Sequence, residues 1–229
     1  MYETRATIAI QPLTPARADD YLRFFDHERG PAFADNPEWA KCYCHYYEVP
    51  LAIDWPSLPG EANRAAMRAR IEVGEMEGYL AYDGDDVVGW MNAQPRHKLP
   101  HCFARMRIAA PEVDVPDHEA VVIVCFVIAP ARRRTGVART LLTQGVAALG
   151  ARGIRVVDAF PFKSGDSVAS ADHYHGSLSM FVDAGFAVLR DDKDLTVVRK
   201  LLLWQRPCAP WLTARIQRCC RSISPYSTR

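Results

Sequence analysis

Hydrophobic and polar residues follow two alternating periods along this chain, which predicts strands interleaved with helices. The clearest strand is the β-branched, uninterrupted apolar run over residues 121–128. A helix is predicted from residue 137 to residue 149, where apolar residues recur at helical spacing. A second strand-like run follows at residues 154–160, so a strand, a turn, a helix and a strand stand in direct succession.

The rest of the chain continues this alternation on both sides. The further predicted elements are a strand at residues 7–13, a helix at 15–25, a helix at 61–75, a strand–turn–strand hairpin at 79–91, a short helix at 177–186 and a closing strand at 195–203. Residues 96–118 resemble a loop, and Glu119 is expected to begin the fourth strand. This order predicts an α/β fold with a mixed, mostly antiparallel central sheet flanked by helices.

Residues 26–59, here named the aromatic segment, form a long stretch without clear periodicity that is dense in aromatic side chains. A segment of this length inside a compact domain is more often functional than idle. It holds Cys42, Cys44 and His45, whose side chains are common zinc ligands. No second pair of ligands stands at a suitable spacing, so we expect buried free thiols and no metal. Cys125, on the apolar strand, is expected to be inert.

Composition limits the classes of function. A net charge of +1 provides no overall field that would attract nucleic acid or an anionic membrane. The odd number of cysteines, seven, and the lack of a signal-like N-terminus favour reduced thiols and a cytoplasmic location. We expect one domain over residues 1–203 and a basic C-terminal extension over residues 204–229. A homodimer is left open.

The most informative motif joins the strand at residues 121–128 to the following helix. It reads Arg133-Arg-Thr-Gly136-Val-Ala138, so small residues stand where a helix begins. Small side chains let a ligand approach the backbone, and the unpaired N–H groups of a helix start attract an anion. The spacing matches neither of the common nucleotide-binding glycine motifs. A pyrophosphate is the expected ligand.

This loop resembles the coenzyme A loop of the GNAT superfamily of N-acetyltransferases. Phe181-Val-Asp-Ala-Gly-Phe186 is similar to the Tyr-x-x-x-Gly-Phe signature of the superfamily's last helix. The resemblance spans about residues 7–203 and implies the GNAT fold, an acetyl-CoA cosubstrate and acetylation of a primary amine. It places the following residues at the coenzyme: Phe126, Val127, Ile128, Arg133, Arg134, Thr135, Gly136, Val137, Ala138 and Arg139.

The resemblance leaves the acid and the base unsettled. Val122 stands where one branch of the superfamily has a glutamate base, and Phe181 stands where many relatives have a tyrosine acid. Glu119 and His118, at the start of the strand, are candidate bases that would act through a water. Tyr174 is the candidate proton donor to the leaving thiolate, with His173 and His175 as alternatives.

The expected substrate is a cationic small-molecule amine, because carboxylates select positive charge and aromatic faces suit both cations and sugar rings. On this ground the candidate substrate-binding residues are Glu28, Asp35, Glu38 and Trp39, and the resemblance to the superfamily places Trp90, Asn92, Asp158 and Phe160 beside the same cleft. Asn36-Pro-Glu-Trp39, Cys42-Tyr-Cys44 and residues 172–177 also resemble a bacterial subgroup that includes kasugamycin-inactivating aminoglycoside 2′-N-acetyltransferases. That resemblance implies an aminosugar substrate and a role in antibiotic resistance.

Two alternatives stay open at this point. The acceptor could be another amine, namely a polyamine, an amino acid or a protein. A non-catalytic module that binds acyl-CoA and regulates a partner is the alternative from a different class, because Val122 and Phe181 lack the functional groups expected at their positions.

Overall fold

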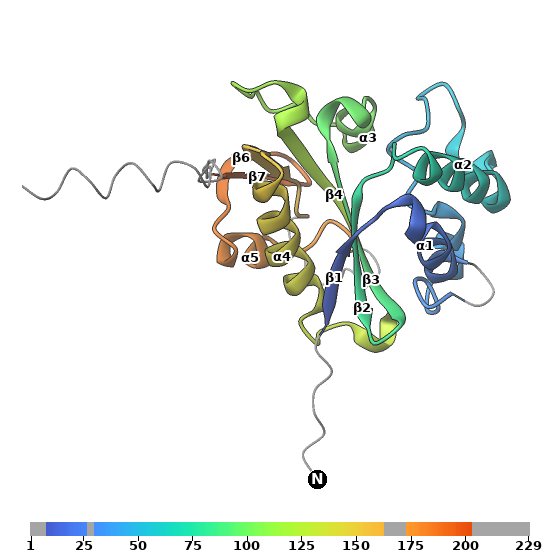
Figure 1. The fold of residues 1–229 in the computed structure, drawn as a ribbon. Helices are drawn as coiled ribbons and strands as arrows, with labels where there is room; N and C mark the ends of the chain where they lie inside the picture. The colour runs from blue at the N-terminus through green and yellow to red at the C-terminus, as the bar shows by residue number, and fades with distance from the viewer. Residues whose placement is uncertain (1–7, 27–29, 163–172, 203–229) are drawn as a thin grey trace, which may run out of the picture.

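The structure, a computed structural model, describes residues 8–26, 30–162 and 173–202. A seven-stranded sheet with the order β1-β2-β3-β4-β5-β7-β6 forms its centre (Figure 1). The strands are β1 (Ala9–Pro12), β2 (Gly78–Asp83), β3 (Asp86–Pro95), β4 (Ala120–Ile128), β5 (Val156–Ala159), β6 (Ala187–Asp191) and β7 (Thr196–Leu201). Neighbouring strands are antiparallel except β4 and β5, which run parallel. The predicted fold class is thereby confirmed.

Helices cover both faces of the sheet (Figure 1). They are α1 (Ala18–Phe25), α2 (Gly60–Glu72), α3 (Cys102–Met106), α4 (Val137–Ala151) and α5 (Leu178–Asp183). Apolar residues of α1 and α2 form one core with Leu80 and Trp90, while α4 packs on the other face against Tyr79 and Met91. Adjacent strand residues enter opposite cores, as the alternation of side chains in a strand requires.

Strand β4 departs from this alternation at Val124. Its pairing with β3 skips that residue, because Asn92 pairs with Cys125 and Ala93 pairs with Ile123. Such a β-bulge leaves one residue unpaired and turns the following side chain. Val124 and Cys125 therefore both enter the core on the α1 and α2 side.

The parallel strands β4 and β5 separate halfway along β4. Their pairing covers only Ala120–Ile123 of β4 and Val156–Ala159 of β5, while β4 continues to Ile128. Residues 124–128 consequently have β3 as a neighbour on one side only. Their other side is open and faces the segment that carries Tyr174.

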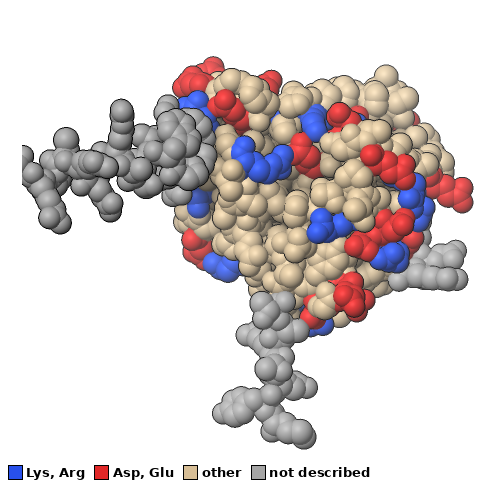
Figure 2. Space-filling view, in the orientation of Figure 1, with Lys and Arg blue, Asp and Glu red and all other residues tan. Residues whose placement is uncertain are grey.

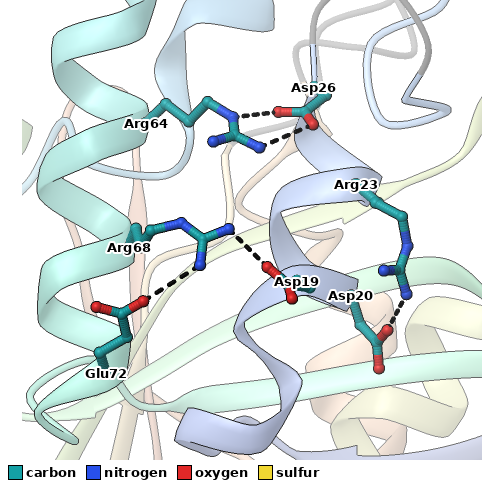
Figure 3. Close-up of polar contacts among 7 residues, drawn as sticks. All are labelled: Asp19, Asp20, Arg23, Asp26, Arg64, Arg68 and Glu72. Atoms are coloured by element: carbon teal, nitrogen blue, oxygen red, sulfur yellow. Dashed lines mark hydrogen bonds and ion pairs between the residues drawn. The ribbon is translucent and has the colours of Figure 1, made fainter.

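Ion pairs join α1 to α2 and hold the segment that follows α1 (Figure 3). Arg64 of α2 donates two hydrogen bonds to Asp26, and Arg68 donates to Asp19 of α1 and to Glu72. Tyr43 also donates to Asp26, at 3.1 Å, so this cluster fixes the aromatic segment against the helices.

Three features differ from the predicted elements. Helix α3 lies within residues 96–118, which were expected to form a loop. Strand β6 was not predicted, because four of its five residues are exposed at the sheet edge and no apolar alternation marks it. Glu119 lies in a short 3-10 turn, Asp117–Glu119, and β4 begins one residue later.

Figure 2 shows acidic and basic side chains interspersed on the visible face. In the parts of the chain that the structure describes, no helix is long and apolar enough to cross a membrane.

Candidate active site

The loop between β4 and α4 has the geometry of an anion site. It passes through Pro130–Arg132, and Gly136 is the N-cap of the 15-residue helix α4. Gly136 has φ +95°, and a Cβ placed there would meet no atom within 4 Å, so the space beside its backbone is open. Because glycine has no side chain to cap the helix, the first-turn amides of α4 are left for a ligand.

A cavity of about 450 Å³, here named the loop cavity, lies over this loop. Its lining includes every predicted coenzyme residue except Thr135, whose hydroxyl donates instead to the Arg132 carbonyl at 2.7 Å. The lining residues are Phe33, Phe126, Val127, Ile128, Arg132, Arg133, Arg134, Gly136, Val137, Ala138, Arg139, His173, Tyr174, Gly176, Ser177 and Met180. Four arginines and a helix start in one cavity suit a polyanionic ligand such as the phosphates of coenzyme A.

Arg133 links this loop to the aromatic segment. Its Nε donates to the Ile128 carbonyl at 3.2 Å, and its two terminal nitrogens bind the carboxylate of Asp35. Asp35 was predicted to bind substrate; in the structure its carboxylate pairs with Arg133 and it lines neither of the two cavities described here.

The open edge of β4 is partly occupied. The Phe126 amide donates to the Tyr174 carbonyl at 2.6 Å, so this amide is not free to bind the pantetheine arm of a coenzyme A molecule. In an antiparallel pair, N–H groups alternate in direction along the strand, and Ile128 therefore directs its amide to the same open side. Of the two, the Ile128 amide is the better donor to a ligand.

A second cavity of about 210 Å³, here named the aromatic cavity, adjoins the first. Its lining residues are Phe33, Glu38, Trp39, Lys41, Cys42, Cys44, Tyr46, Tyr47, Trp55, Cys125, Val127 and Tyr174. Phe33, Val127 and Tyr174 line both cavities, which therefore meet at the open end of β4. A ligand in each cavity would bring two reacting groups together at this wall.

Tyr174 is held at the junction by aromatic rings and hydroxyl groups. Its ring packs edge-on against Trp39 and Phe162, each at a centroid distance of 5.3 Å. Its hydroxyl hydrogen-bonds to Tyr47, whose own hydroxyl lies 3.0 Å from His175 Nε2. Burial raises the pKa of Tyr174 above its ordinary value, so the phenol keeps its proton at neutral pH.

The neighbouring candidates have other surroundings. His175 is buried, and burial lowers its pKa to about 3, which keeps the imidazole neutral. His173 lines the loop cavity. Phe181 lies in the core, where it packs against Phe126 and Phe186, so the position of the missing tyrosine does not face either cavity. Tyr174 is therefore the phenol placed to meet both ligands.

The candidate bases His118 and Glu119 are not at the site. Neither lines a cavity, and Glu119 pairs with Arg155 at 3.3 Å. Six residues of extended chain separate Glu119 from Cys125, which is about 20 Å at the rise of a strand. These two residues stand at the start of β4, whereas the strands separate at its other end.

Four of the predicted substrate residues belong to the protein interior instead. Trp90 packs edge-on against Tyr21 at 5.0 Å, and Phe160 packs against Phe103 at 5.8 Å. The Asp158 carboxylate receives two hydrogen bonds from Arg199, and Asn92 donates to the Cys44 sulfur at 3.3 Å. All four side chains are buried and absent from both cavity linings. The sequence predicted the strands that carry these residues, but it did not show that their side chains point into the protein core.

Glu38 and Trp39 alone among the predicted substrate residues line the aromatic cavity. Glu28 lies outside the described residues. Sequence reasoning missed Cys44, Cys125 and Lys41 in the cavity wall, because the bulge that turns Cys125 leaves no mark in the hydrophobic pattern. Within residues 8–26, 30–162 and 173–202, no group of three or more His, Cys, Asp or Glu side chains could hold a metal ion.

Comparisons with known proteins agree with this geometry. A sequence profile of the acetyltransferase (GNAT) family matches residues 38–174, which is more than half of the chain. The chain therefore belongs to the GNAT acetyltransferase family, and this membership confirms the expectation of an acetyl-CoA-dependent N-acetyltransferase at the level of the family. No curated protein sequence matches the chain.

Solved structures match this chain at low sequence identity. The GNAT domain of S. lividans PAT has 18% identity and a TM-score of 0.50, with 86% of this chain and 91% of that chain covered. PaiA N-acetyltransferase from Thermoplasma acidophilum, in complex with coenzyme A, has 13% identity and a TM-score of 0.48, with 85% and 99% covered. At such identities the likeness concerns the fold alone.

Proposed function

We propose that this chain transfers an acetyl group from acetyl-CoA in the loop cavity to a primary amine of a small molecule in the aromatic cavity. The observation that carries this proposal is that the two cavities share Phe33, Val127 and Tyr174. A thioester entering from one side and an amine entering from the other would meet at this wall, and such positioning supplies a large part of the rate of acyl transfer.

Different groups of the chain bind the coenzyme and assist the departure of its sulfur. The first-turn amides of α4 and the arginines of the loop bind the phosphates, while the Ile128 amide orients the arm. Acetyl-CoA supplies the activated acetyl group. Tyr174 donates a hydrogen bond or its proton to the sulfur that leaves. Burial raises the pKa of this phenol, and the same burial would raise the proton affinity of the departing thiolate.

The aromatic cavity supports an acceptor with few charges and a ring or flat body. Its lining combines six aromatic side chains with one carboxylate, Glu38, and one ammonium group, Lys41. Aromatic faces stack on sugar rings and attract a single cation, whereas a polycation would need several carboxylates. An aminosugar with few amines fits this wall, and kasugamycin is our specific candidate because residues 36–44 resemble the kasugamycin subgroup.

The experiment measures release of coenzyme A thiol from acetyl-CoA in the presence of kasugamycin, conventional aminoglycosides, polyamines and amino acids. We expect turnover with kasugamycin, a product heavier by one acetyl group, and resistance in a sensitive bacterium that expresses the protein. Turnover with polyamines or amino acids alone would retain the acetyltransferase and reject the antibiotic. Tight acetyl-CoA binding without turnover on any amine would favour the regulatory module.

Two variants test the acceptor side separately. Trp39→Ala removes a stacking face and Glu38→Gln removes the cavity's carboxylate at nearly constant shape. Each should lower kcat/KM for the amine about tenfold, the equivalent of ~1.4 kcal/mol, and leave acetyl-CoA affinity unchanged. Glu61→Gln, an exposed change on α2, is the matched control.

A further inference from the structure

Cys44 and Cys125 form a pair of thiols in the wall of the aromatic cavity. They lie far apart in the sequence, but both lie beside Asn92, which pairs with Cys125 across β3 and β4 and donates its side-chain amide to the Cys44 sulfur. Both are almost entirely buried, with 3% and 8% of their surface exposed, and both line the cavity. A small molecule that enters the cavity therefore reaches both sulfurs.

The backbone brings the two sulfurs together by two unusual local structures. The β-bulge at Val124 turns Cys125 towards the aromatic segment. On the other side, Tyr43 and Cys44 have φ values of 43° and 55°, a left-handed conformation that non-glycine residues rarely adopt. Such strain persists only where the surroundings impose it. Here Tyr21 donates to the Tyr43 carbonyl at 2.6 Å and thereby holds the turn.

A chain of buried polar groups ends on the Cys44 sulfur. Gln94 Nε2 donates to Glu48 Oε1 and to the side-chain oxygen Oδ1 of Asn92, both at 3.0 Å. This fixes the Asn92 amide so that its N–H group donates to Cys44 Sγ at 3.3 Å. The Cys44 sulfur thus accepts a hydrogen bond from Asn92, which favours its thiolate form.

The two thiols consequently differ in acidity. The neighbouring Cys125 thiol, followed by the hydrogen bond from Asn92, lowers the pKa of Cys44 even though burial opposes it. The neighbouring Cys44 sulfur, together with burial, raises the pKa of Cys125. By contrast, burial raises the pKa of Cys42 to about 12. A thiolate beside a protonated thiol is the arrangement of a reactive cysteine with a resolving partner.

We propose that Cys44 and Cys125 are a peroxide-sensitive pair, which closes to a disulfide in the wall of the aromatic cavity and stops acetyl transfer. The inhibition rests on the function proposed above, whereas the oxidation of the pair does not depend on it.

The reaction balances with hydrogen peroxide as the oxidant. The Cys44 thiolate attacks one peroxide oxygen, the O–O bond breaks, and the leaving hydroxide takes up a proton to become water. The Cys125 sulfur then attacks the sulfur of the resulting sulfenic acid. The S–S bond forms, the S–O bond breaks, and the hydroxide leaves with the proton of Cys125 as a second water. Two thiols lose two electrons in total, and one peroxide gains them.

Closure changes the geometry of the cavity wall. A disulfide requires the sulfurs to approach to about 2.0 Å, which is far shorter than a thiol hydrogen bond. The movement draws the turn at Cys44 towards β4, where Val127 lines both cavities. Because small displacements of positioned groups are costly, we expect kcat/KM to fall about tenfold or more.

The experiment treats the reduced full-length protein with hydrogen peroxide and maps disulfides in non-reducing digests. We expect a peptide linking residue 44 to residue 125, a loss of activity in parallel with its formation, and recovery of both after dithiothreitol. Cys102→Ser removes a buried cysteine outside both cavities and should leave the linkage and the inhibition intact. Cys125→Ser should abolish the linkage and let dimedone trap a sulfenic acid on Cys44.

Each contrary result overturns a definite part of the proposal. Free Cys44 and Cys125 after peroxide treatment, or links only to Cys208, Cys219 or Cys220, would reject the pair. A complete Cys44–Cys125 link with unchanged activity would reject the switch. If no amine is acetylated, the linked peptide still tests the pair, so its failure is distinguishable from failure of the proposed function. Should Cys125→Ser fail to fold, early dimedone labelling of Cys44 in the wild-type protein replaces that variant.

Discussion

Tyr174 places a phenol hydroxyl where the two cavities meet, and this makes a sharp test at the scale of one residue. Tyr174→Phe keeps the ring that packs on Trp39 and Phe162 and removes only the hydroxyl. We expect kcat to fall about 100-fold, which is typical for loss of a general acid. Acetyl-CoA affinity should stay unchanged, as measured by calorimetry.

Tyr82→Phe is the matched control for this change. Its hydroxyl donates to Asp20 at 2.8 Å, away from both cavities, so the variant should retain normal turnover. Normal turnover of Tyr174→Phe would remove this residue from the mechanism. A proportional loss of acetyl-CoA affinity would indicate a binding role instead.

At the scale of elements, a substitution at the start of α4 tests most directly where acetyl-CoA binds. Gly136→Glu places a negative charge and bulk beside the first-turn amides, where we expect the phosphates. We therefore expect acetyl-CoA binding to disappear in calorimetry while circular dichroism remains that of a folded protein.

Gly136→Ala separates charge from backbone strain. Alanine at φ +95° costs about 1–2 kcal/mol, and no neighbouring atom lies within 4 Å of its Cβ. Stability should fall by this amount in both variants, yet the alanine variant should retain measurable acetyl-CoA affinity. Equal affinity in Gly136→Glu and wild type would refute the loop assignment.

The elements that sequence predicted best are those with strong local signals. Strand β4 is a continuous apolar run, and the loop after it carries a motif, so both were found with the right boundaries to within a residue or two. The bulge at Val124 and the edge strand β6 were not found. A bulge depends on the register between two strands, and an exposed edge has no hydrophobic pattern to detect.

The site was predictable only where one short segment carries it. Nearly all the residues predicted to bind the coenzyme lie in one short segment of the sequence, and all but Thr135 line one cavity. The wall of the aromatic cavity combines residues from 33–55, 125–127 and 174, which no local pattern relates. Trp90 and Asp158 illustrate the opposite error, because residue types suited to a ligand also serve a core and a buried ion pair.

For the whole molecule, buried His175 predicts a dependence of stability on pH. Its pKa is about 3 in the folded protein and close to the ordinary 6.5 when unfolded. Below pH 6.5 the unfolded chain binds a proton that the folded protein does not, so stability falls as the pH decreases towards 3. Between about pH 6.5 and about pH 4 the loss should be roughly 3 kcal/mol.

Urea unfolding across this range measures the effect, and His175→Gln isolates it. Carboxylates contribute to acid destabilisation in both proteins, so the difference between their pH profiles belongs to the histidine. The glutamine variant should be less stable at neutral pH and should lose less stability on acidification. Parallel profiles would contradict a neutral, buried imidazole in the folded protein.

The ion pair between Arg133 and Asp35 has a consequence for the kinetic order of the reaction. A phosphate that binds Arg133 must compete with Asp35, and Phe33 beside Asp35 lines both cavities. Occupancy of one cavity therefore alters the affinity of the other, and thermodynamic linkage makes this influence reciprocal. We expect the acceptor KM to vary with acetyl-CoA concentration, whereas Asp35→Asn should bind acetyl-CoA more tightly and make the two substrates bind independently in initial-rate measurements.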